Sequence, residues 1–423
     1  MYTTWAESRA TSVARGRRAD GRLRRPEALW ARVILLLVVV SVVPWRDQAI
    51  YSGGVDVVVV AKAIIAITAA GVAAVAALRT HERQRMAMAP AIIVTMIVAT
   101  SVIGSYAAGD AVSASVQAAR ILLCVVAVSL AARLLGPEDL IYALLSVLAV
   151  IALVSALTGI PTLATGRLGG GIPAVHPNEL AGLAAPPLIG AVALSVRRGI
   201  TPARTLVVLA LGGILVATGS RTALIATALA AGVALVTNGR LKPDMVMVLL
   251  ACLPVAYAAA FFTPVVDELA SRGGTTDTSA TLMARYDGWR VVLGWEWASW
   301  EKWLGKGLST KTVAVDLRWR DTQVLDSSWI SALAQVGVAG TLLLVVLLLV
   351  ALVRAVRSSK LRGVALPLLV LIVARGFTES GLLDSAVMFV VFFTLATALA
   401  ADRYDDRDLP LGKRTHAVNG EYS

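Results

Sequence analysis

The sequence predicts an all-α, polytopic integral membrane protein with about twelve transmembrane helices and one large external loop between spans nine and ten. Of its 423 residues, 57% are hydrophobic, whereas a soluble globular chain has about 45–50%. Apolar runs of about 18 residues or more recur, which is long enough to cross a hydrocarbon core about 30 Å thick. The basic residues lie mainly in short loops between these runs, as in cytoplasmic loops of membrane proteins.

The predicted spans follow the apolar runs in order. The pair that meets at "TGSRT" could instead be one bent hairpin. Residues 1–28 form an Arg-rich cytoplasmic tail, and the first apolar run is expected to be an uncleaved signal anchor. Residues 29–401 form the membrane domain, which includes the large external loop 264–326, and residues 402–423 form a second cytoplasmic tail. The spans cover residues 29–45, 55–78, 89–106, 111–135, 140–159, 178–196, 203–219, 221–237, 245–263, 327–353, 361–378 and 382–401.

The distribution of Lys and Arg places both termini in the cytoplasm, because short basic loops stay on that side of the membrane. This pattern accounts for the net charge of +12 without a nucleic-acid partner. Cys124 and Cys252 both lie in apolar runs, with no spacing typical of a disulfide framework or a zinc site. The unusual polar segments then face outside, and they are residues 164–180, 218–222, 264–326 and 375–385.

The first external segment of interest reads "GRLGGGIPAVHPNEL". Pro177 and Asn178 suit a helix start, with Asn178 as a possible cap. Arg167 stands beside a glycine run that lets backbone N–H groups approach an anion, and a helix N-terminus adds a positive dipole. A plain Gly/Pro-rich connector explains the segment equally well, and His176 alone is weak evidence for a catalyst.

Two further arginines lie near the predicted external boundary of the membrane. Arg221 stands between two apolar runs, where a charge either marks a functional path or extends to the interface. Arg375 and Glu379 are four residues apart and can pair with each other on a helix, which leaves Glu379 as a spare carboxylate.

The long loop contains six of the ten tryptophans. Residues 281–304 are predicted to form an amphipathic helix that Arg285 and Arg290 open and two glycines close. Its stripe of Trp297, Trp300 and Trp303 fits either an interfacial aromatic belt or a surface on which sugars stack.

Several external arginines, with no acidic cluster to hold a metal, indicate an anion with spread charge. A phosphate or diphosphate fits best, because guanidinium binds it bidentately. In a transfer reaction with a diphosphate leaving group, these cations would neutralise the developing charge, and a carboxylate could accept the proton of an attacking hydroxyl. No metal or other cofactor is expected.

The stretch "DSSWISALAQVGVAGT" (326–341) resembles the signature of the O-antigen ligase and O-antigen polymerase superfamily. In that signature a histidine and one polar residue precede nine residues and a G-x-x-G-T motif. This chain has Asp326 in the place of the histidine, then Ser327 and, after nine residues, the G-x-x-G-T. Upstream, "GRLGGGIPAVHPNELAG", "TGSRTAL" and "ARYDGWRVVLGWEWASWEKWLGKGLS" resemble further family motifs in the same order, so the resemblance spans roughly residues 160–345.

The resemblance implies a glycosyltransferase in the cytoplasmic membrane of a bacterium, with its active site on the external face. It would transfer a glycan from a polyprenyl-pyrophosphate carrier to a sugar hydroxyl. Membrane lipids would be its other partners. Arg221 and Arg285 would hold the pyrophosphate and Arg167 would line the cavity. The expected catalytic residues are Asp326, Arg285 and Arg221, and the expected substrate-binding residues are Arg167, His176, Asn178, Arg290, Ser327 and Glu379.

Aspartate cannot replace a cationic histidine on a pyrophosphate, but it can accept a proton from a hydroxyl. The departure at Asp326 favours a polysaccharide polymerase over an O-antigen-type ligase, which remains the alternative. A role of Asp326 as N-cap of the next helix is compatible with either reaction, and Ser327 and Ser328 are the other cap candidates. The other classes considered are a lipid-linked glycan flippase or secondary transporter, a metal-dependent polyprenyl-phosphate-sugar glycosyltransferase, and an inactive scaffold.

Overall fold

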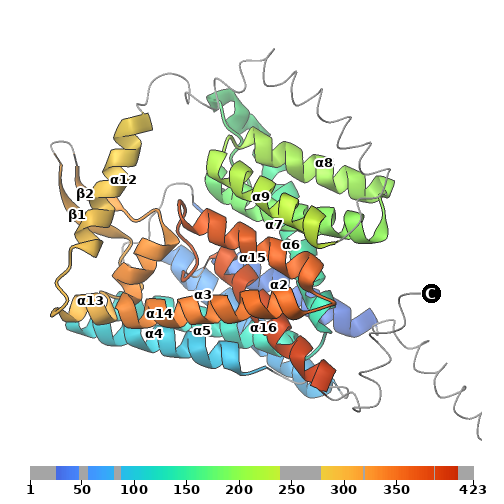
Figure 1. Cartoon of the computed structure of the whole chain (residues 1–423), viewed down its shortest axis with the longest axis horizontal. Helices are drawn as coiled ribbons and strands as arrows, with labels where there is room; N and C mark the ends of the chain where they lie inside the picture. Colours follow the sequence, from blue (N-terminus) through green and yellow to red (C-terminus); the bar gives the residue numbers. More distant parts are fainter. Residues whose placement is uncertain are drawn as a thin grey trace, which may run out of the picture.

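The computed structural model describes residues 25–46, 56–80, 87–238, 278–317, 320–384 and 386–407. Over these residues the chain is almost entirely helical, with one short β-hairpin (Figure 1). In chain order the elements are α2 (Arg25–Val42), α3 (Val57–Arg79), α4 (Ala89–Ala107), α5 (Ala111–Ala131), α6 (Pro137–Thr158), η1 (Ile160–Thr165), α7 (Pro177–Arg198), α8 (Pro202–Ala217), α9 (Arg221–Thr237), α12 (Thr278–Leu293), α13 (Trp300–Leu304), β1 (Thr312–Leu317), β2 (Arg320–Val324), α14 (Ser328–Arg357), α15 (Arg362–Gly376) and α16 (Val387–Arg407).

The prediction of a helical membrane protein is confirmed. Six described helices, α3, α4, α5, α6, α7 and α14, are long and apolar enough to cross a membrane. The helices α8 and α9 and residues Val387–Asp402 of α16 are shorter apolar helices. Each predicted span other than 245–263 overlaps a described helix, and residues 245–263 lie outside the described residues. The "TGSRT" stretch separates two helices, α8 and α9.

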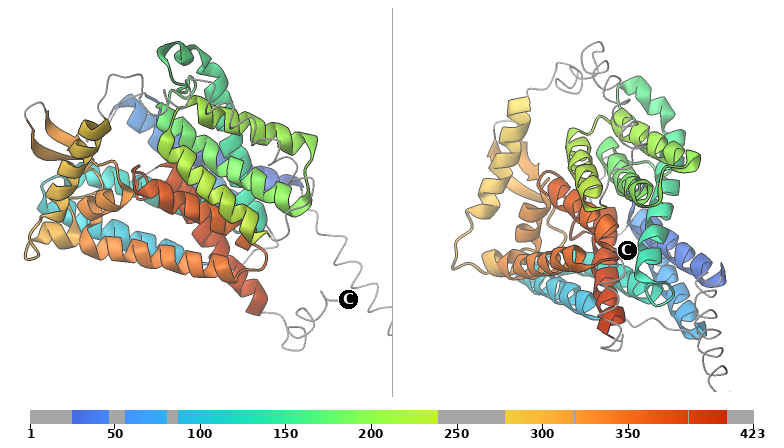
Figure 2. Two further views of the ribbon diagram at one scale, coloured as in Figure 1. Left: turned by 45° about the horizontal axis from the view of Figure 1, so that its top comes forward. Right: turned by 45° about the vertical axis from the view of Figure 1, so that its right-hand side comes forward.

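Helix α16 is the centre of the bundle. It contacts α2, α4, α5, α6, α7, α14 and α15, and its buried Phe389, Phe392 and Phe393 are among the largest side chains of the core. Around it, α14 runs along α4, α2 and α3 pack with α5, and α7 joins α6, α8 and α9, while α15 packs against α9 (Figures 1 and 2). Exposed apolar side chains such as Ile64, Ile67 and Leu229 lie on the outside of this bundle, as lipid-facing residues do.

The all-α prediction is wrong in one place, because the large loop contains a β-hairpin. Strands β1 and β2 are antiparallel, with Thr312 opposite Val324, and they lie beside α12 at one end of the molecule (Figure 1). A small second core joins the hairpin to α12 and to the start of α14, and it contains Val292, Val313, Val315, Leu325, Ile330 and Ala334. This core fixes the loop on the helix bundle.

The single helix predicted over 281–304 is also wrong, since two helices occupy this stretch. Helix α12 ends at Leu293 and its last turn closes with the Gly294 N–H on the Arg290 carbonyl, 2.8 Å away. Helix α13 begins after Ser299, whose hydroxyl accepts from the Lys302 N–H at 3.3 Å. Serine is a favourable N-cap because it satisfies one of the N–H groups that a first turn leaves unpaired.

Helix α14 is broken at Gly337, which has φ 64° and ψ −169°. Only glycine adopts this conformation readily, and the break leaves the preceding carbonyl groups without helical partners. The chain that follows α13 satisfies them: the Lys306 N–H donates to the Ala334 carbonyl at 2.8 Å, and the Gly307 N–H donates to the Gln335 carbonyl at 3.1 Å. The kink is therefore a docking point for the large loop.

The glycines at this junction allow backbone segments to pack closely against the break in α14. A Cβ atom at Gly337 would overlap the Trp303 carbonyl group, and one at Gly305 would overlap the Gln335 backbone. On α4, a Cβ atom at Gly104 would overlap the Gly305 carbonyl oxygen. At the Gly337 break, the close neighbour of α14 is thus the backbone of the large loop, which lies between α14 and α4.

Candidate functional site

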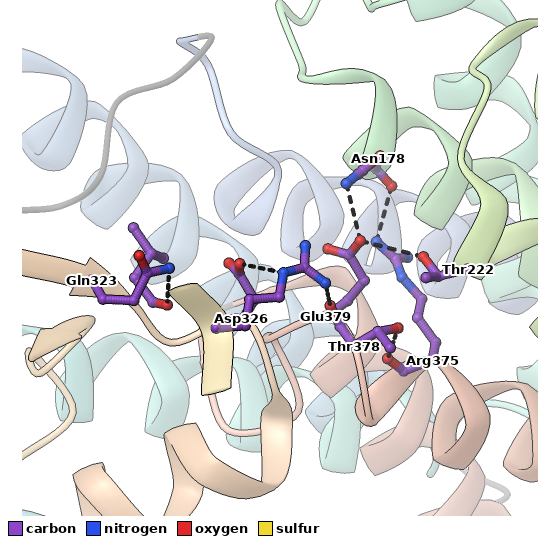
Figure 3. Close-up of polar contacts among 9 residues, drawn as sticks. Asn178, Thr222, Gln323, Asp326, Arg375, Thr378 and Glu379 are labelled. Carbon is purple, nitrogen blue, oxygen red and sulfur yellow. Dashed lines mark hydrogen bonds and ion pairs between the residues drawn. The ribbon is translucent and has the colours of Figure 1, made fainter. Parts of the chain in front are cut away.

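The N-termini of α7, α9 and α14 meet the C-terminus of α15 at Glu379. Its Oε1 accepts from Asn178 Nδ2 on α7 at 3.0 Å and from Thr222 Oγ1 on α9 at 3.4 Å. Its carbonyl oxygen accepts from the Ser328 N–H at 3.1 Å and from Ser328 Oγ at 2.7 Å. Figure 3 shows Asn178, Thr222 and Glu379 pointing toward one another. Helix N-termini carry partial positive charge, so their convergence favours an anion here.

Asn178 hydrogen-bonds four other residues. Besides its bond to Glu379, its Oδ1 accepts from Arg167 Nη2 at 2.9 Å, and its carbonyl oxygen accepts from Arg375 Nη2 at 2.9 Å. Its own N–H donates to His176 Nδ1 at 3.3 Å. His176, and not Asn178, is therefore the N-cap of α7. The two side-chain bonds also fix the orientation of the Asn178 amide, because one end donates and the other accepts.

Arg285 and Asp326 form an ion pair at this site, with 3.0 Å between Arg285 Nε and Asp326 Oδ2. Arg285 Nη1 also donates to the Thr378 carbonyl oxygen at 3.5 Å. The two side chains are 20% and 31% exposed, respectively, so the guanidinium is sheltered but reachable. The structure thus brings together two of the three expected catalytic residues.

The polar start of α14 ties this helix to α15. Ser327 is the N-cap residue of α14, but its hydroxyl makes no cap hydrogen bond and instead donates to the Gly376 carbonyl oxygen at 3.3 Å. Ser328 bonds the Glu379 carbonyl oxygen. These carbonyl groups lie at and just after the end of α15, where a helix leaves its last acceptors unpaired. Asp326 does not cap α14; its carboxylate is directed to Arg285.

Arg375 is buried, and its guanidinium binds the start of α7. The expected pairing with Glu379 on one helix face is replaced by the bond from Arg375 Nη2 to the Asn178 carbonyl oxygen, while the Glu379 N–H bonds the Arg375 carbonyl oxygen at 3.0 Å. The guanidinium lies against Gly182, where a Cβ atom would overlap it. The small residue on α7 makes room for the arginine.

Arg221 is the first residue of α9, directly before Thr222. Its Nη2 is buried and has no hydrogen-bond partner among the described residues. A buried guanidinium N–H without a partner is costly, and an anionic ligand would satisfy it. The expected role of Arg221 in holding a phosphate group is consistent with this position and stays a prediction.

The glycine loop does not present its N–H groups to a ligand. The Gly169 N–H donates to Thr162 Oγ1 at 2.7 Å, the Gly170 N–H to the Val175 carbonyl at 2.8 Å, and the Gly171 N–H to the Ser155 carbonyl at 2.9 Å. The anion-binding interpretation of this run is therefore wrong, and the connector interpretation holds. Arg167, beside it, clamps the loop by donating from Nε to the Thr218 carbonyl at 2.8 Å.

Arg290 and the tryptophans lie apart from this network. Arg290 is exposed on α12, about 140° around the helix from Arg285 at 100° per residue. Trp297 and Trp303 are 66% and 46% exposed and pack edge to face, with ring centroids 6.0 Å apart. Lys302 Nζ lies 5.1 Å from the Trp297 ring centroid. A substrate role for Arg290 stays a prediction, as do the two roles expected of the tryptophans.

An apolar groove of about 530 Å³ begins at the same cluster. It is lined on α9 by residues spaced three or four apart, and on α15 in the same way, so that one face of each helix forms a wall. Its polar end consists of Thr222 and Thr378, which contact Glu379 and Arg285, respectively. Its apolar lining includes Ile225, Ala226, Leu229, Val370, Ala374 and Phe377.

The charge of the site combines a buried carboxyl with a surplus of arginines. Burial raises the pKa of the Glu379 carboxyl above its usual value. The positive charges of Arg375 and Arg285 oppose this shift, and the negative charges of Glu179 and Asp326 add to it. The arginines around the cluster are Arg167, Arg221, Arg285 and Arg375. Among the described residues, no group of three or more His, Cys, Asp or Glu side chains is placed to hold a metal ion.

Several residues of the site were not expected from the sequence. The sequence gives no signal for Thr222 or Thr378, and the four-residue spacing of Arg375 from Glu379 predicts only that these two pair. Lys311 Nζ pairs with Asp384 Oδ1, to which Gln335 Nε2 also donates at 3.4 Å. Because the Leu325 N–H bonds the Lys311 carbonyl at 3.0 Å, this pair holds the base of the hairpin next to Asp326. The sequence signal for the Lys311–Asp384 pair is weak, because each residue is only a charge that lies shortly before a strand or an apolar helix.

No protein-family model matches the chain, and a search of curated proteins finds no match.

Proposed function

We propose that this protein is a metal-independent glycosyltransferase that uses a polyprenyl-pyrophosphate glycan as donor and a sugar hydroxyl as acceptor. Polymerisation of a cell-surface polysaccharide is the favoured reaction, and transfer to a terminal acceptor, as in O-antigen ligation, is the alternative. The proposal includes about twelve spans, cytoplasmic termini, and a site on the external face of a bacterial cytoplasmic membrane.

The observation that carries the proposal is the groove that ends at the arginine cluster. Its apolar walls on α9 and α15 suit a hydrocarbon chain. At its polar end, Thr222 directly follows Arg221 at the start of α9, and the Thr378 carbonyl accepts from Arg285. A lipid with an anionic headgroup has the same division into apolar and charged parts. A diphosphate matches the number of cationic donors better than a single carboxylate does, because guanidinium groups pair bidentately with phosphate oxygens.

In this proposal the arginines stabilise the diphosphate as it leaves the sugar. Arg221 and Arg285 would neutralise charge on the diphosphate as its bond to the sugar breaks, in a site already arranged for that charge. Asp326 pairs with the Arg285 guanidinium at Nε, and the Thr378 carbonyl accepts from Nη1. Nη2 would then bind the donor. A carboxylate at the site would receive the proton of the acceptor hydroxyl.

Reconstitution with a lipid-linked oligosaccharide tests the proposed reaction directly. We expect glycan transfer that continues in the presence of a chelator of divalent ions. Longer carrier-linked chains would identify a polymerase, and transfer off the carrier would identify a ligase. Movement of the intact lipid across the bilayer without transfer would instead identify a flippase, and activity that requires a divalent ion would contradict the arginine-based mechanism.

Filling the groove is expected to weaken binding of the donor lipid. Ala374→Trp on α15 should lower kcat/KM for a long-chain donor about tenfold or more, as expected when several methylene contacts are lost. A donor with a short lipid should be much less affected. Ala228→Trp is the matched control, because Ala228 is exposed on α9 outside the groove. Equal effects on long and short donors would show that the groove does not hold the chain.

A further inference from the structure

We infer that Glu379 receives the proton of the acceptor hydroxyl, a role that the sequence analysis assigned to Asp326. The inference rests on the proposed function and adds to it the identity of the base. The residues that carry it are Asn178 on α7 and Thr222 on α9, which bond the Glu379 carboxylate (Figure 3). Ser328 on α14 bonds its backbone carbonyl.

Glu379 is held rigidly, with one carboxylate oxygen engaged. Its backbone bonds the end of α15 through its N–H and the start of α14 through its carbonyl. Its Oε1 accepts from Asn178 and Thr222, whereas no described residue hydrogen-bonds Oε2. A general base needs a carboxylate that is fixed in position and has an oxygen available to the incoming hydroxyl.

Asp326 is engaged differently. Its Oδ2 lies 3.0 Å from Arg285 Nε, so this carboxylate is engaged with the guanidinium. If Asp326 took a proton, it would lose the charge that orients Arg285 just when the diphosphate needs that cation. The geometry therefore separates two tasks: Asp326 orients Arg285, and Glu379 accepts the proton.

The position of Glu379 also suits the acceptor. Thr222, which bonds Oε1, is at the polar end of the groove where the donor headgroup would lie. The charged groups that face Glu379 are Arg375 on α15, Glu179 on α7, Arg285 on α12 and Asp326 before α14, and burial outweighs them in raising its pKa. A base whose pKa lies closer to the working pH is a more effective proton acceptor.

The acceptor oxygen forms a bond to the anomeric carbon of the donor sugar, and its proton passes to Glu379 Oε2. The bond between that carbon and the diphosphate oxygen breaks, and the electron pair leaves with the diphosphate, next to Arg221 and Arg285. The products are the lengthened glycan and the polyprenyl diphosphate, and Glu379 later releases its proton to water.

Glu379→Gln, Glu379→Asp and Asp326→Asn are compared with wild type in the reconstituted transfer reaction across a range of pH. Glutamine keeps an oxygen for Asn178 and Thr222 but cannot accept the proton. We expect Glu379→Gln to lower kcat by about 100-fold or more, with donor KM changed only a few-fold. The fall in activity toward low pH, which is the acidic limb of the pH profile, should be lost in this variant. Glu379→Asp should retain part of the rate with a displaced limb, and Asp326→Asn should keep the limb.

Thermal melting of the same variants separates chemistry from folding. Because burial raises the pKa of Glu379, the ionised form destabilises the folded protein, and stability is lost as pH rises from the unfolded toward the folded pKa. Glu379→Gln should therefore melt at or above the wild-type temperature at neutral pH, and the difference should shrink in acid. A lower melting temperature for Glu379→Gln together with an unchanged limb in Glu379→Asp would assign Glu379 to structure.

A Glu379→Gln variant that keeps its rate and its acidic limb would overturn the inference, as would loss of the limb in Asp326→Asn alone. Either result leaves the proposed function intact, because wild-type transfer is measured in the same assay. Absence of transfer by the wild-type protein would instead overturn the proposed function and this inference together.

Discussion

Gly337→Ala is expected to destabilise the protein by about 4 kcal/mol or more. Gly337 has φ 64° and ψ −169°, a conformation that costs other residues about 1–3 kcal/mol. Its new Cβ atom would also overlap the Trp303 carbonyl group, and overpacking of rigid backbone costs about 1–3 kcal/mol or more. The loop cannot yield easily, because Lys306 and Gly307 bond the carbonyl groups that the kink exposes.

The measurement is the yield of monodisperse protein in detergent and its melting temperature. Gly232→Ala on α9 is the matched control, since no described atom lies within 4 Å of a Cβ atom there and alanine is the better helix former. We expect the control to melt at or above the wild-type temperature. A Gly337→Ala variant that melts like wild type would show that the loop does not dock on the kink as described.

The helices were predictable because a membrane demands long apolar segments with their backbone hydrogen bonds satisfied internally. The glycines of α14 were predictable as a close-packing site, but not their partner. Sequence pattern cannot show that the backbone after α13 returns to the α14 kink, because that contact depends on how the whole large loop folds. The hairpin was missed for the same reason, since its apolar face packs on α12 and α14 and not on a continuous sheet.

The site was predictable as a set of residues and not as a network. Asn178 and Glu379 were both candidates, yet they are 201 positions apart, and no local spacing indicates that they touch. The glycine run shows the opposite failure. Its composition favours an anion site, but the acceptors that use its N–H groups, such as Ser155 and Val175, become visible only when the loop is folded against α6.

Arg285→Ala is expected to abolish most transfer activity while leaving the fold intact. A preorganised donor at a developing negative charge contributes about 100–1,000-fold to kcat, and Arg285 is the sheltered arginine that contacts both Asp326 and Thr378. Arg285→Lys should recover little, because an ammonium group cannot bind Asp326 through one nitrogen and a diphosphate through the others. The measurement is kcat/KM with a lipid-linked oligosaccharide, together with the melting temperature.

The chain offers a matched control in a second Arg–Asp pair. Arg46 Nη1 lies 2.7 Å from Asp56 Oδ2 in an exposed pair outside the site, so Arg46→Ala removes the same charge and leaves an aspartate unpaired in the same way. We expect this variant to keep near wild-type activity. A loss as large as that of Arg285→Ala would show that the effect comes from overall charge.

The double variant Arg285→Ala/Asp326→Asn distinguishes the two roles that Arg285 can have. If Arg285 only neutralises Asp326, removing both charges should restore activity, because the destabilising unpaired carboxylate is gone. If Arg285 acts on the diphosphate, the double variant should remain about as inactive as Arg285→Ala, since nothing has replaced the lost cation. Such non-additivity between contacting residues is what a double-mutant cycle measures, and we expect the second result, with Asp326 acting through the arginine that it orients.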